Sequence, residues 1–339
     1  MNMSVSQAGS KARTARTLII AAALGGLTAV SSAQTQTTAK PYPAKPIRYV
    51  VGSAAGGNTD IVSRIVAEGL TRGLGQNVIV ENRPGAMQIP AISYVAKAAP
   101  DGYTLLGTGF IFTTNAVLYN DLPYDSARDF AAVGYIGSTP SLVVIHPALP
   151  AGSIKELIAY IKARPPGTLN YGSTGIGSPA HLGGELFSSM AGVQLVHVPY
   201  KGTAQVTADS VNGVLQVGFP ALGSIQTFLK SGKLKALGIG SARRSPQMKD
   251  LPPVADVLPG YGVQLWNGTQ APAGTPKPVI ARFNAELNKT LNTPDTRDKL
   301  EKIDMDVETK TPEETAEYID AEIRKWAKLV REVGIKGER

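Results

Sequence analysis

The chain has 339 residues, of which 43% are hydrophobic and 18% charged, with no cysteine and a formal net charge of +8. This length suits about two domains of ordinary size, and the composition is that of a folded globular protein rather than a disordered one. The absence of cysteine excludes disulfides, zinc–thiolate sites and thiol nucleophiles. The basic residues form no clustered stripe interleaved with aromatics, so nucleic acid is not expected as a partner.

Residues 1–33 have the pattern of a cleaved secretory signal peptide, which predicts a periplasmic location. Lys11, Arg13 and Arg16 precede the apolar stretch "TLIIAAALGGLTAV", and "SSA" before Gln34 offers a small-residue cleavage site. A retained membrane anchor is the alternative, although the apolar stretch is short for a span. Removal of the leader takes away three basic residues and lowers the net charge from +8 to +5. Residues 34–43 are polar and proline-punctuated, which favours a linker.

From residue 47 onward, β-type runs alternate with helical patterns, which predicts an α/β fold with mainly parallel sheets. The first series has strands at 47–51, 77–82 and 103–108, with helices at 60–74 and 90–99. The second has strands at 141–147, 169–173, 195–200, 214–219 and 234–241, with helices at 153–165, 178–192 and 203–213. A proline-rich bridge at 251–266 leads to two helices at about 276–292 and 312–333. We expect two domains, residues 44–138 with 251–339 and residues 139–250.

The first candidate site is the loop "SAAGGNTD" at 53–60, between the first strand and the first helix. Gly56 and Gly57 let a ligand approach the backbone closely. Capping of the helix by Asn58, Thr59 or Asp60 would leave free N–H groups that favour an anion. A tight turn that only connects strand to helix is the alternative.

The second candidate site is the loop "GSTGIGS" at 172–178, which carries the hydroxyls of Ser173, Thr174 and Ser178. Ser178 is expected to cap the next helix, with Pro179 at its first position. Neither loop contains Arg or Lys, so neutral donors and waters would hold an anion. The basic residue nearest in sequence is Lys201, for which a solvated loop lysine is the favoured interpretation.

No pattern of catalysis or of cofactor binding is found in the sequence. The glycines of the second loop superficially fit a dinucleotide pattern, but the next strand ends without the acidic residue that would hold a ribose. His181 and Glu185 share a helix face, yet two ligands do not make a metal site. His197 alternates with apolar residues and is expected to be a hydrogen-bonded strand histidine. No GxSxG elbow occurs, so we expect no enzyme, catalytic residue, cofactor or metal.

Several longer motifs run in matching order from about Pro43 to the C-terminus. They include "AAGGNTDIVSRIVAEGLTRGLGQNVIVENRPGA", "VAKAAPDGYTLL", "LNYGSTGIGSPAHLGGELF", "VPYKGTAQVTAD" and "LWNGTQAPAGTPKPVIARFNAEL". With these motifs the chain resembles the Bug-type extracytoplasmic receptors of tripartite tricarboxylate transporters. The resemblance implies a type II periplasmic binding protein, with a ligand cleft and a hinge between two domains. Such a protein, expected as a monomer, closes on a small carboxylate such as a dicarboxylate or an aromatic acid and delivers it to the membrane components of the transporter.

The resemblance also implies ligand contacts from both loops, from the helix that follows the second loop and from the cleft edge. The residues are Ala55, Gly56, Gly57, Asn58, Thr59 and Asp60 of the first loop, Ser173, Thr174, Gly175 and Ser178 of the second, His181 one helical turn further, and Thr108 and Tyr200 at the edge.

The chain departs from the family pattern at Met87, Phe112 and Pro220, where glycine or polar residues are common. These three residues favour a ligand with an apolar or aromatic body. Two other functions stay open on sequence alone. The same fold can sense a ligand for a periplasmic signalling kinase, or act as an enzyme on an organic acid.

Overall fold

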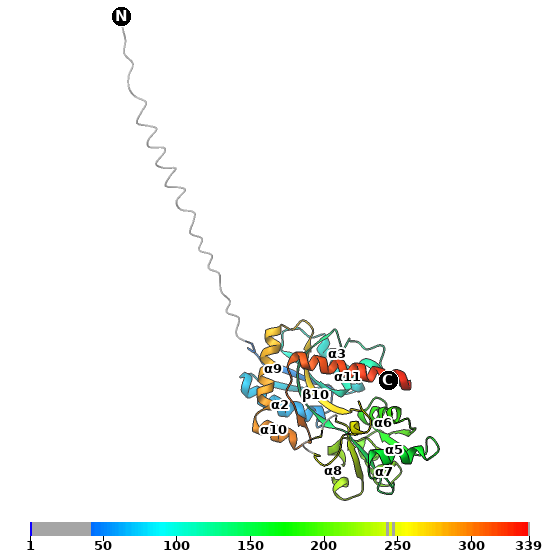
Figure 1. Ribbon diagram of the computed structural model, residues 1–339. Coiled ribbons are helices and arrows are strands. Elements are labelled where there is room, and N and C mark those ends of the chain that lie inside the picture. Colours follow the sequence, from blue (N-terminus) through cyan, green and yellow to red (C-terminus); the bar gives the residue numbers. More distant parts are fainter. Residues whose placement is uncertain (2–41, 242–243, 246–247, 338–339) are drawn as a thin grey trace. The chain divides into compact units, whose positions relative to one another are not determined.

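The computed structural model describes Met1 and residues 42–241, 244–245 and 248–337. Apart from Met1, the expected leader at 1–33 lies outside these described residues, as does most of the expected linker at 34–43. The chain from Tyr42 to Arg339 is one compact unit and contains two β-sheets with their helices (Figure 1). Among the described helices, none combines the length and the apolar character that a membrane crossing requires.

The first sheet has six strands in the order β11-β4-β10-β3-β1-β2. The strands are β1 (Ile47–Val51), β2 (Val78–Asn82), β3 (Thr104–Gly109), β4 (Phe130–Pro140), β10 (Gln264–Pro272) and β11 (Asp306–Val307). Strand β1 is parallel to β2 and β3, whereas β10 is antiparallel to β3 and β4. The strand that returns from the second sheet is thus inserted into the middle of the first.

Helices cover both faces of the first sheet. They are α2 (Asn58–Leu74), α3 (Ile89–Ala96), α4 (Phe110–Leu118), α9 (Lys277–Leu291), α10 (Pro294–Glu301) and α11 (Pro312–Val333), with the short 3-10 turn η1 (Ala86–Gln88) before α3. Because side chains alternate along a strand, Tyr49 and Val51 of β1 pack with α2 and α9, while Val50 packs with α3 and α11. Burial on both faces explains why β1 is almost continuously apolar.

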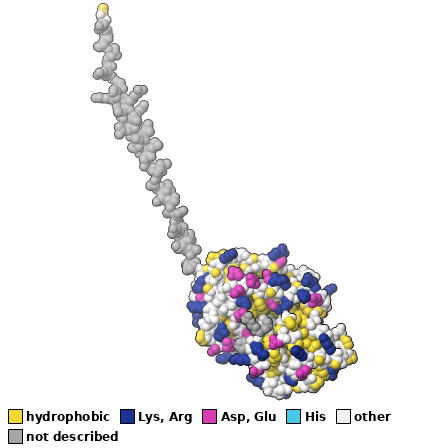
Figure 2. Space-filling view, viewed as in Figure 1, with side chains coloured by type: hydrophobic (Ala, Val, Ile, Leu, Met, Phe, Trp, Pro, Cys, Tyr) yellow, Lys and Arg dark blue, Asp and Glu magenta, His cyan; other side chains and the backbone are white. Residues whose placement is uncertain are grey.

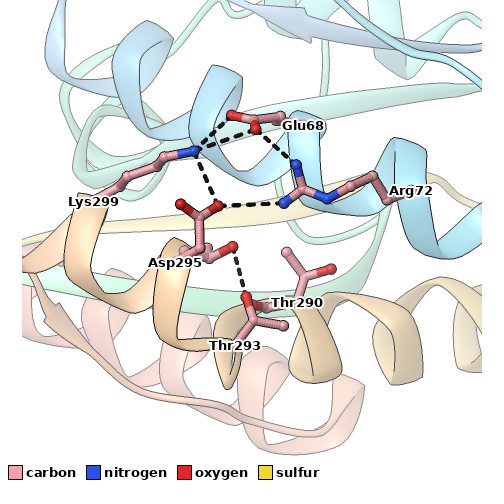
Figure 3. A network of polar contacts seen from close by, with 7 residues as sticks. Glu68, Arg72, Thr290, Thr293, Asp295 and Lys299 are labelled. Atoms are coloured by element: carbon pink, nitrogen blue, oxygen red, sulfur yellow. Dashed lines mark hydrogen bonds and ion pairs between the residues drawn. The ribbon is translucent and has the colours of Figure 1, made fainter.

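Helix α10 is tied to α2 by a surface network of ion pairs (Figure 3). Lys299 Nζ lies 3.0 Å from Glu68 Oε2 and 3.0 Å from Asp295 Oδ2. Arg72 Nη1 lies 2.7 Å from Glu68 Oε1, and Arg72 Nη2 lies 3.4 Å from Asp295 Oδ2. Leu300 of the same helix is fully buried. This polar helix is held by two buried side chains, those of Leu300 and Thr296, and by charges from a segment far away in the sequence.

The second sheet has five strands in the order β7-β6-β8-β5-β9. The strands are β5 (Leu142–Ile145), β6 (Asn170–Ser173), β7 (Val196–Pro199), β8 (Val217–Gly218) and β9 (Lys235–Ile239). The accompanying helices are α5 (Ile154–Lys162), α6 (Pro179–Ala191), α7 (Thr203–Val211) and α8 (Leu222–Lys230), and the 3-10 turn η2 (Val254–Asp256) lies in the return segment. Strand β6 is parallel to β7 and β8, and β5 is antiparallel to β8 and β9.

The two segments that connect the sheets are hydrogen-bonded to each other where they cross. The N–H of Gly240 donates to the carbonyl of Ser141 at 2.7 Å, and the N–H of Val263 donates to the carbonyl of Gly240 at 2.8 Å. Ser141 Oγ donates to the carbonyl of Val263 at 2.9 Å. A Cβ on Gly240 would lie 2.3 Å from Ser141 Oγ, so this crossing admits only glycine.

The expected α/β class and the two-sheet architecture are confirmed. Each antiparallel pair of the described strands contains β4, β5 or β10, the strands at which the chain passes between the two sheets. Helices α4, α8 and α10 and the long strands β4 and β10 were not expected from the sequence. The proposed division into residues 44–138 with 251–339 and residues 139–250 stays a prediction.

Candidate functional site

The first loop joins β1 to α2 and turns at Gly56, whose φ is +81°. The N–H of Gly57 donates to the carbonyl of Ala54 at 3.0 Å and closes the turn. A Cβ on Gly52 would lie 2.3 Å from Cβ of Gln88, so position 52 has no room for a side chain. The loop therefore begins in close contact with η1.

Asp60 lies at the first turn of α2 and anchors the first loop. Its Oδ2 accepts hydrogen bonds from the Gly56 N–H at 2.8 Å and from Arg64 Nε at 3.1 Å, and its Oδ1 accepts from Asn82 Nδ2 at 2.8 Å. Burial alone would raise the pKa of Asp60, but the hydrogen bonds from Arg64, Gly56 and Asn82 outweigh burial and lower this pKa. Because protein donors occupy both oxygens, Asp60 positions the loop. A direct contact between Asp60 and a ligand stays a prediction.

Helix α2 begins without a side-chain cap, and its N-cap residue is Gly57. The expectation that Asn58, Thr59 or Asp60 caps the helix is wrong. The Asp60 carboxylate accepts hydrogen bonds from the loop and its neighbours and does not cap the helix. Asn58 Oδ1 accepts instead from Asn267 Nδ2 at 3.0 Å. The first N–H groups of a helix have no partner within the helix. Left without a capping side chain, they are donors suited to an anion.

Unpaired polar atoms gather at the same end of the first sheet. Thr108 Oγ1, Asn267 Oδ1 and Ser53 Oγ are buried and have no hydrogen-bond partner among the described residues. Thr108 lies opposite Gly268, the neighbour of Asn267, and Ser53 comes two residues after β1 ends. Buried polar groups need partners, so this end of the sheet is a place for waters or for a polar ligand.

The second loop follows β6 and is held together by its own hydroxyls. Ser173 Oγ accepts from the Gly175 N–H at 3.1 Å and lies 2.7 Å from His197 Nε2. Ser178 Oγ accepts from the His181 N–H at 3.4 Å, which confirms Ser178 as the N-cap of α6. These contacts occupy two of the three hydroxyls, and Thr174 is the exposed one.

The rings of His181 and His197 lie 4.2 Å apart next to this loop. Burial, followed by the neighbouring His197, lowers the pKa of His181 to about 4, and burial also lowers the pKa of His197. The Gly177 N–H donates to His181 Nδ1 at 3.2 Å, so the neutral ring carries its proton on Nε2. The expectation of a hydrogen-bonded His197 is confirmed by its contact with Ser173. Near pH 7 this loop therefore offers hydrogen bonds without a positive charge.

A cavity of about 160 Å³ opens where β6 and β8 end and where α6, α7 and α8 begin. Its polar lining consists of hydroxyl side chains from the second loop and from α7 and α8: Ser173, Thr174, Thr203, Thr207, Ser210 and Ser224. None of the described residues that line it is charged. Helices α7 and α8 begin without side-chain caps, at Gly202 and Ala221. The cavity thus combines hydroxyl groups with uncapped helix starts.

The turn η1 lies between the two loops. The side chain of Gln88 adjoins Gly52 of the first loop, and the added Cβ of Gly177 in the second loop would lie 3.8 Å from Met87 Cε. Ala86, Met87 and Gln88 have φ values of +40°, +52° and +65°, a left-handed conformation that is rare for residues with a side chain. Such conformations persist only where the surroundings impose them, and they cluster at functional sites.

The structure brings only part of the expected set together. Ser173 and Thr174 line the cavity, whereas the residues expected from the first loop, together with Thr108, are not among its described lining. The Tyr200 hydroxyl donates to Asp209 Oδ2 at 2.6 Å. Phe112 lies in the core with its ring edge-on to Phe130, so its proposed contact with a ligand is not supported.

Several lining residues were not among the expected site residues. Thr203 and Thr207 belong to the motif "VPYKGTAQVTAD", so a signal for them was present in the sequence. Ser224 comes from α8, which the sequence did not predict, and Leu265 comes from β10 of the other sheet. Only the folded chain shows that these segments converge.

Comparison with known proteins assigns the family. Residues 62–335 match the tripartite tricarboxylate transporter family receptor, and the chain belongs to this family. It is 33% identical to protein BugT of Bordetella pertussis over 318 residues, which cover 93% of this chain and 97% of BugT.

Two solved structures are also similar to this chain. R. palustris Rpa4515 with adipate has a TM-score of 0.73 and 33% identity, covering 87% of this chain and 99% of that one. The periplasmic binding protein BugD has a TM-score of 0.70 and 32% identity, covering 88% of this chain and 100% of that one. The fold and the family are those of periplasmic solute-binding receptors, and one of these two structures holds adipate.

Proposed function

We propose that the chain is a periplasmic receptor that binds a small carboxylate and delivers it to the membrane components of a tripartite tricarboxylate transporter. The observation that carries this proposal is the cavity at the ends of β6 and β8, with its hydroxyl lining and its uncapped helix starts. Helix N-termini and neutral donors hold an anion without an ion pair. The similarity to a structure with adipate supports a carboxylate as that anion.

In this proposal the first loop supplies further polar groups that bind the ligand. Its free helix N–H groups and the unpaired atoms of Thr108 and Asn267 lie at the end of the first sheet. Closure of the two sheet-bearing halves about the crossing at Ser141 and Gly240 would bring these donors to the ligand. Closure of this kind occurs on microsecond to millisecond timescales in binding proteins.

We propose binding without chemical change, with the protein acting as a monomer. Ser173 and His197 are within hydrogen-bond distance, as a nucleophile and its base would be. However, Ser173 is fully buried and its Oγ already bonds to Gly175. This engagement favours a structural role for the pair over hydrolysis.

Calorimetric titration of the mature chain with a panel of mono-, di- and tricarboxylates tests the function. We expect at least one acid to bind and to be recovered unchanged after incubation. Gly57→Arg should abolish binding, because the arginine side chain would block the start of α2. The φ of −71° at Gly57 is one that arginine adopts, although the new Cβ would lie 3.1 Å from the carbonyl oxygen of Ala54, which must shift slightly. Ala163→Arg adds the same charge at an exposed helix end and should bind like the parent.

Three outcomes would contradict parts of the proposal. Absence of binding to every acid would exclude the carboxylate receptor, and a converted acid would indicate an enzyme. Deletion of the gene with loss of a signalling response but intact uptake would indicate the alternative function, a ligand sensor for a signalling kinase.

A further inference from the structure

We propose that the cavity at the ends of β6 and β8 accepts a compact apolar ring, and that the ligand is an aromatic monocarboxylate of the benzoate class. This inference rests on the proposed function and names the kind of carboxylate that the site takes. It depends on the lining, the size and the polarity of the cavity.

Apolar side chains make up most of the cavity wall away from the hydroxyls. They include Val144 of β5, Val206 of α7, Phe219 and Pro220 after β8, Ile225 of α8 and Leu265 of β10. Phe219 is buried and meets the ring of Tyr171 edge-on at 5.5 Å, so this wall is backed by the core. A wall of this composition favours the apolar body of a ligand and disfavours a second ionised group.

The volume of the cavity matches a single ring. It measures about 160 Å³, and an engineered protein cavity of roughly 150 Å³ lined by apolar side chains binds benzene. A citrate would have to place three carboxylates among hydroxyls and apolar groups, with no cation among the described lining residues. A benzoate has only one carboxylate to satisfy.

The polar groups give the ring acid a preferred orientation. Ser173 ends β6, Thr174 follows it in the second loop, and Thr203 is the first residue of α7. The start of α8 already has an acidic neighbour, because a Cβ on Gly223 would lie 3.2 Å from Asp304 Oδ2. The carboxylate of the ligand therefore points to the second loop, and its ring points to Phe219, Pro220 and Leu265.

Calorimetry with benzoate, adipate, malate and citrate tests the ligand class. We expect benzoate to bind at least tenfold more tightly than each of the other three acids. Pro220→Asp should weaken benzoate at least tenfold by placing a charge in the wall. The carbonyl of residue 220, which accepts from the Leu142 N–H at 2.8 Å, is kept in this variant. The exposed Pro150→Asp adds the same charge outside the cavity lining and should leave benzoate binding unchanged.

A second variant keeps the test independent of any loss of folding. Val206→Ala enlarges the cavity and should raise the affinity for 1-naphthoate relative to benzoate at least fivefold. Tighter binding of adipate, malate or citrate than of benzoate, or an unchanged naphthoate-to-benzoate ratio in Val206→Ala, would overturn the ring pocket while leaving the carboxylate receptor intact. Binding of none of the acids would instead count against the receptor function itself.

Discussion

Asp60 shows how a single buried carboxylate can hold a loop of the candidate site in place. It is almost fully buried, and its two oxygens join the first loop, the first turn of α2 and the end of β2. Asp60 and Arg64 lie four residues apart in the sequence and form an ion pair within α2. Their hydrogen bonds to Asn82 cannot be predicted from the sequence, because Asn82 belongs to strand β2.

Asp60→Asn should lower the free energy of unfolding by about 1–3 kcal/mol, the usual cost of leaving buried hydrogen-bonding groups unsatisfied. The amide brings an NH₂ group against the donors of Gly56, Arg64 and Asn82. Urea unfolding measures the loss, and Asp298→Asn on an exposed helix face serves as the matched control, within about 0.5 kcal/mol of the parent.

The ligand affinity of Asp60→Asn separates its two possible roles. A residue that positions the loop should lose stability and affinity together. Weaker binding at unchanged stability would show instead that Asp60 contacts the ligand directly.

At the scale of elements, the helices that the sequence predicts are those with local signals. Ser153 and Ser178 accept from the N–H groups three residues later, and Gly192 ends α6 in a left-handed conformation, all as the sequence indicates. Helix α10 escaped prediction because its stability comes from Leu300 and from charges on α2. Stabilisation by partners far away in the sequence produces no periodic pattern within the helix itself.

The turn η1 is the element whose conformation most contradicts its sequence. Three successive residues with side chains adopt positive φ, although a left-handed conformation costs roughly 1–2 kcal/mol per residue. Ala86 is exposed, so packing of its methyl group does little to offset this cost.

Ala86→Gly should therefore raise the free energy of unfolding by about 0.5–1 kcal/mol, after allowance for the greater freedom of glycine in the unfolded chain. Thermal and urea unfolding measure the change. Ala163→Gly is the matched control, because Ala163 is exposed at φ −76° and should lose stability on the same substitution. Equal losses in both variants would mean that η1 is not strained.

At the scale of the whole molecule, the alternation of strands and helices predicts two α/β halves, and the glycine-rich loops are the segments of each half that the sequence predicts to bind. The cavity itself could not be predicted from the sequence. Its lining comes from β5, the second loop, α7, α8 and β10, and Leu265 arrives from the other sheet. Convergence of this kind is a property of the fold, since no single segment carries a recognisable pattern for it.

The stability of the whole chain should fall as the pH drops from 7.5 to 5, because of the two buried histidines beside the second loop. Burial lowers the pKa of both, to about 4 for His181, whereas an unfolded histidine titrates near pH 6.5. Between these values the unfolded chain binds more protons than the folded chain, so the free energy of unfolding decreases with falling pH. The contribution of His181 is about 1–2 kcal/mol by pH 5.

Other groups act in the opposite direction or in another window, so a variant is needed to isolate the histidines. Burial raises the pKa of Asp304 and Asp306 in the folded chain, so these groups add stability as the pH falls below those raised pKa values. The pKa of Asp60 is lowered, so its contribution to stability is lost only at lower pH, where it becomes protonated. His181→Asn keeps an acceptor for the Gly177 N–H but cannot titrate. Urea unfolding at pH 7.5, 6 and 5 should give a shallower pH dependence for His181→Asn than for the parent. Parallel curves for the two proteins would mean that His181 is protonated equally in the folded and unfolded chains.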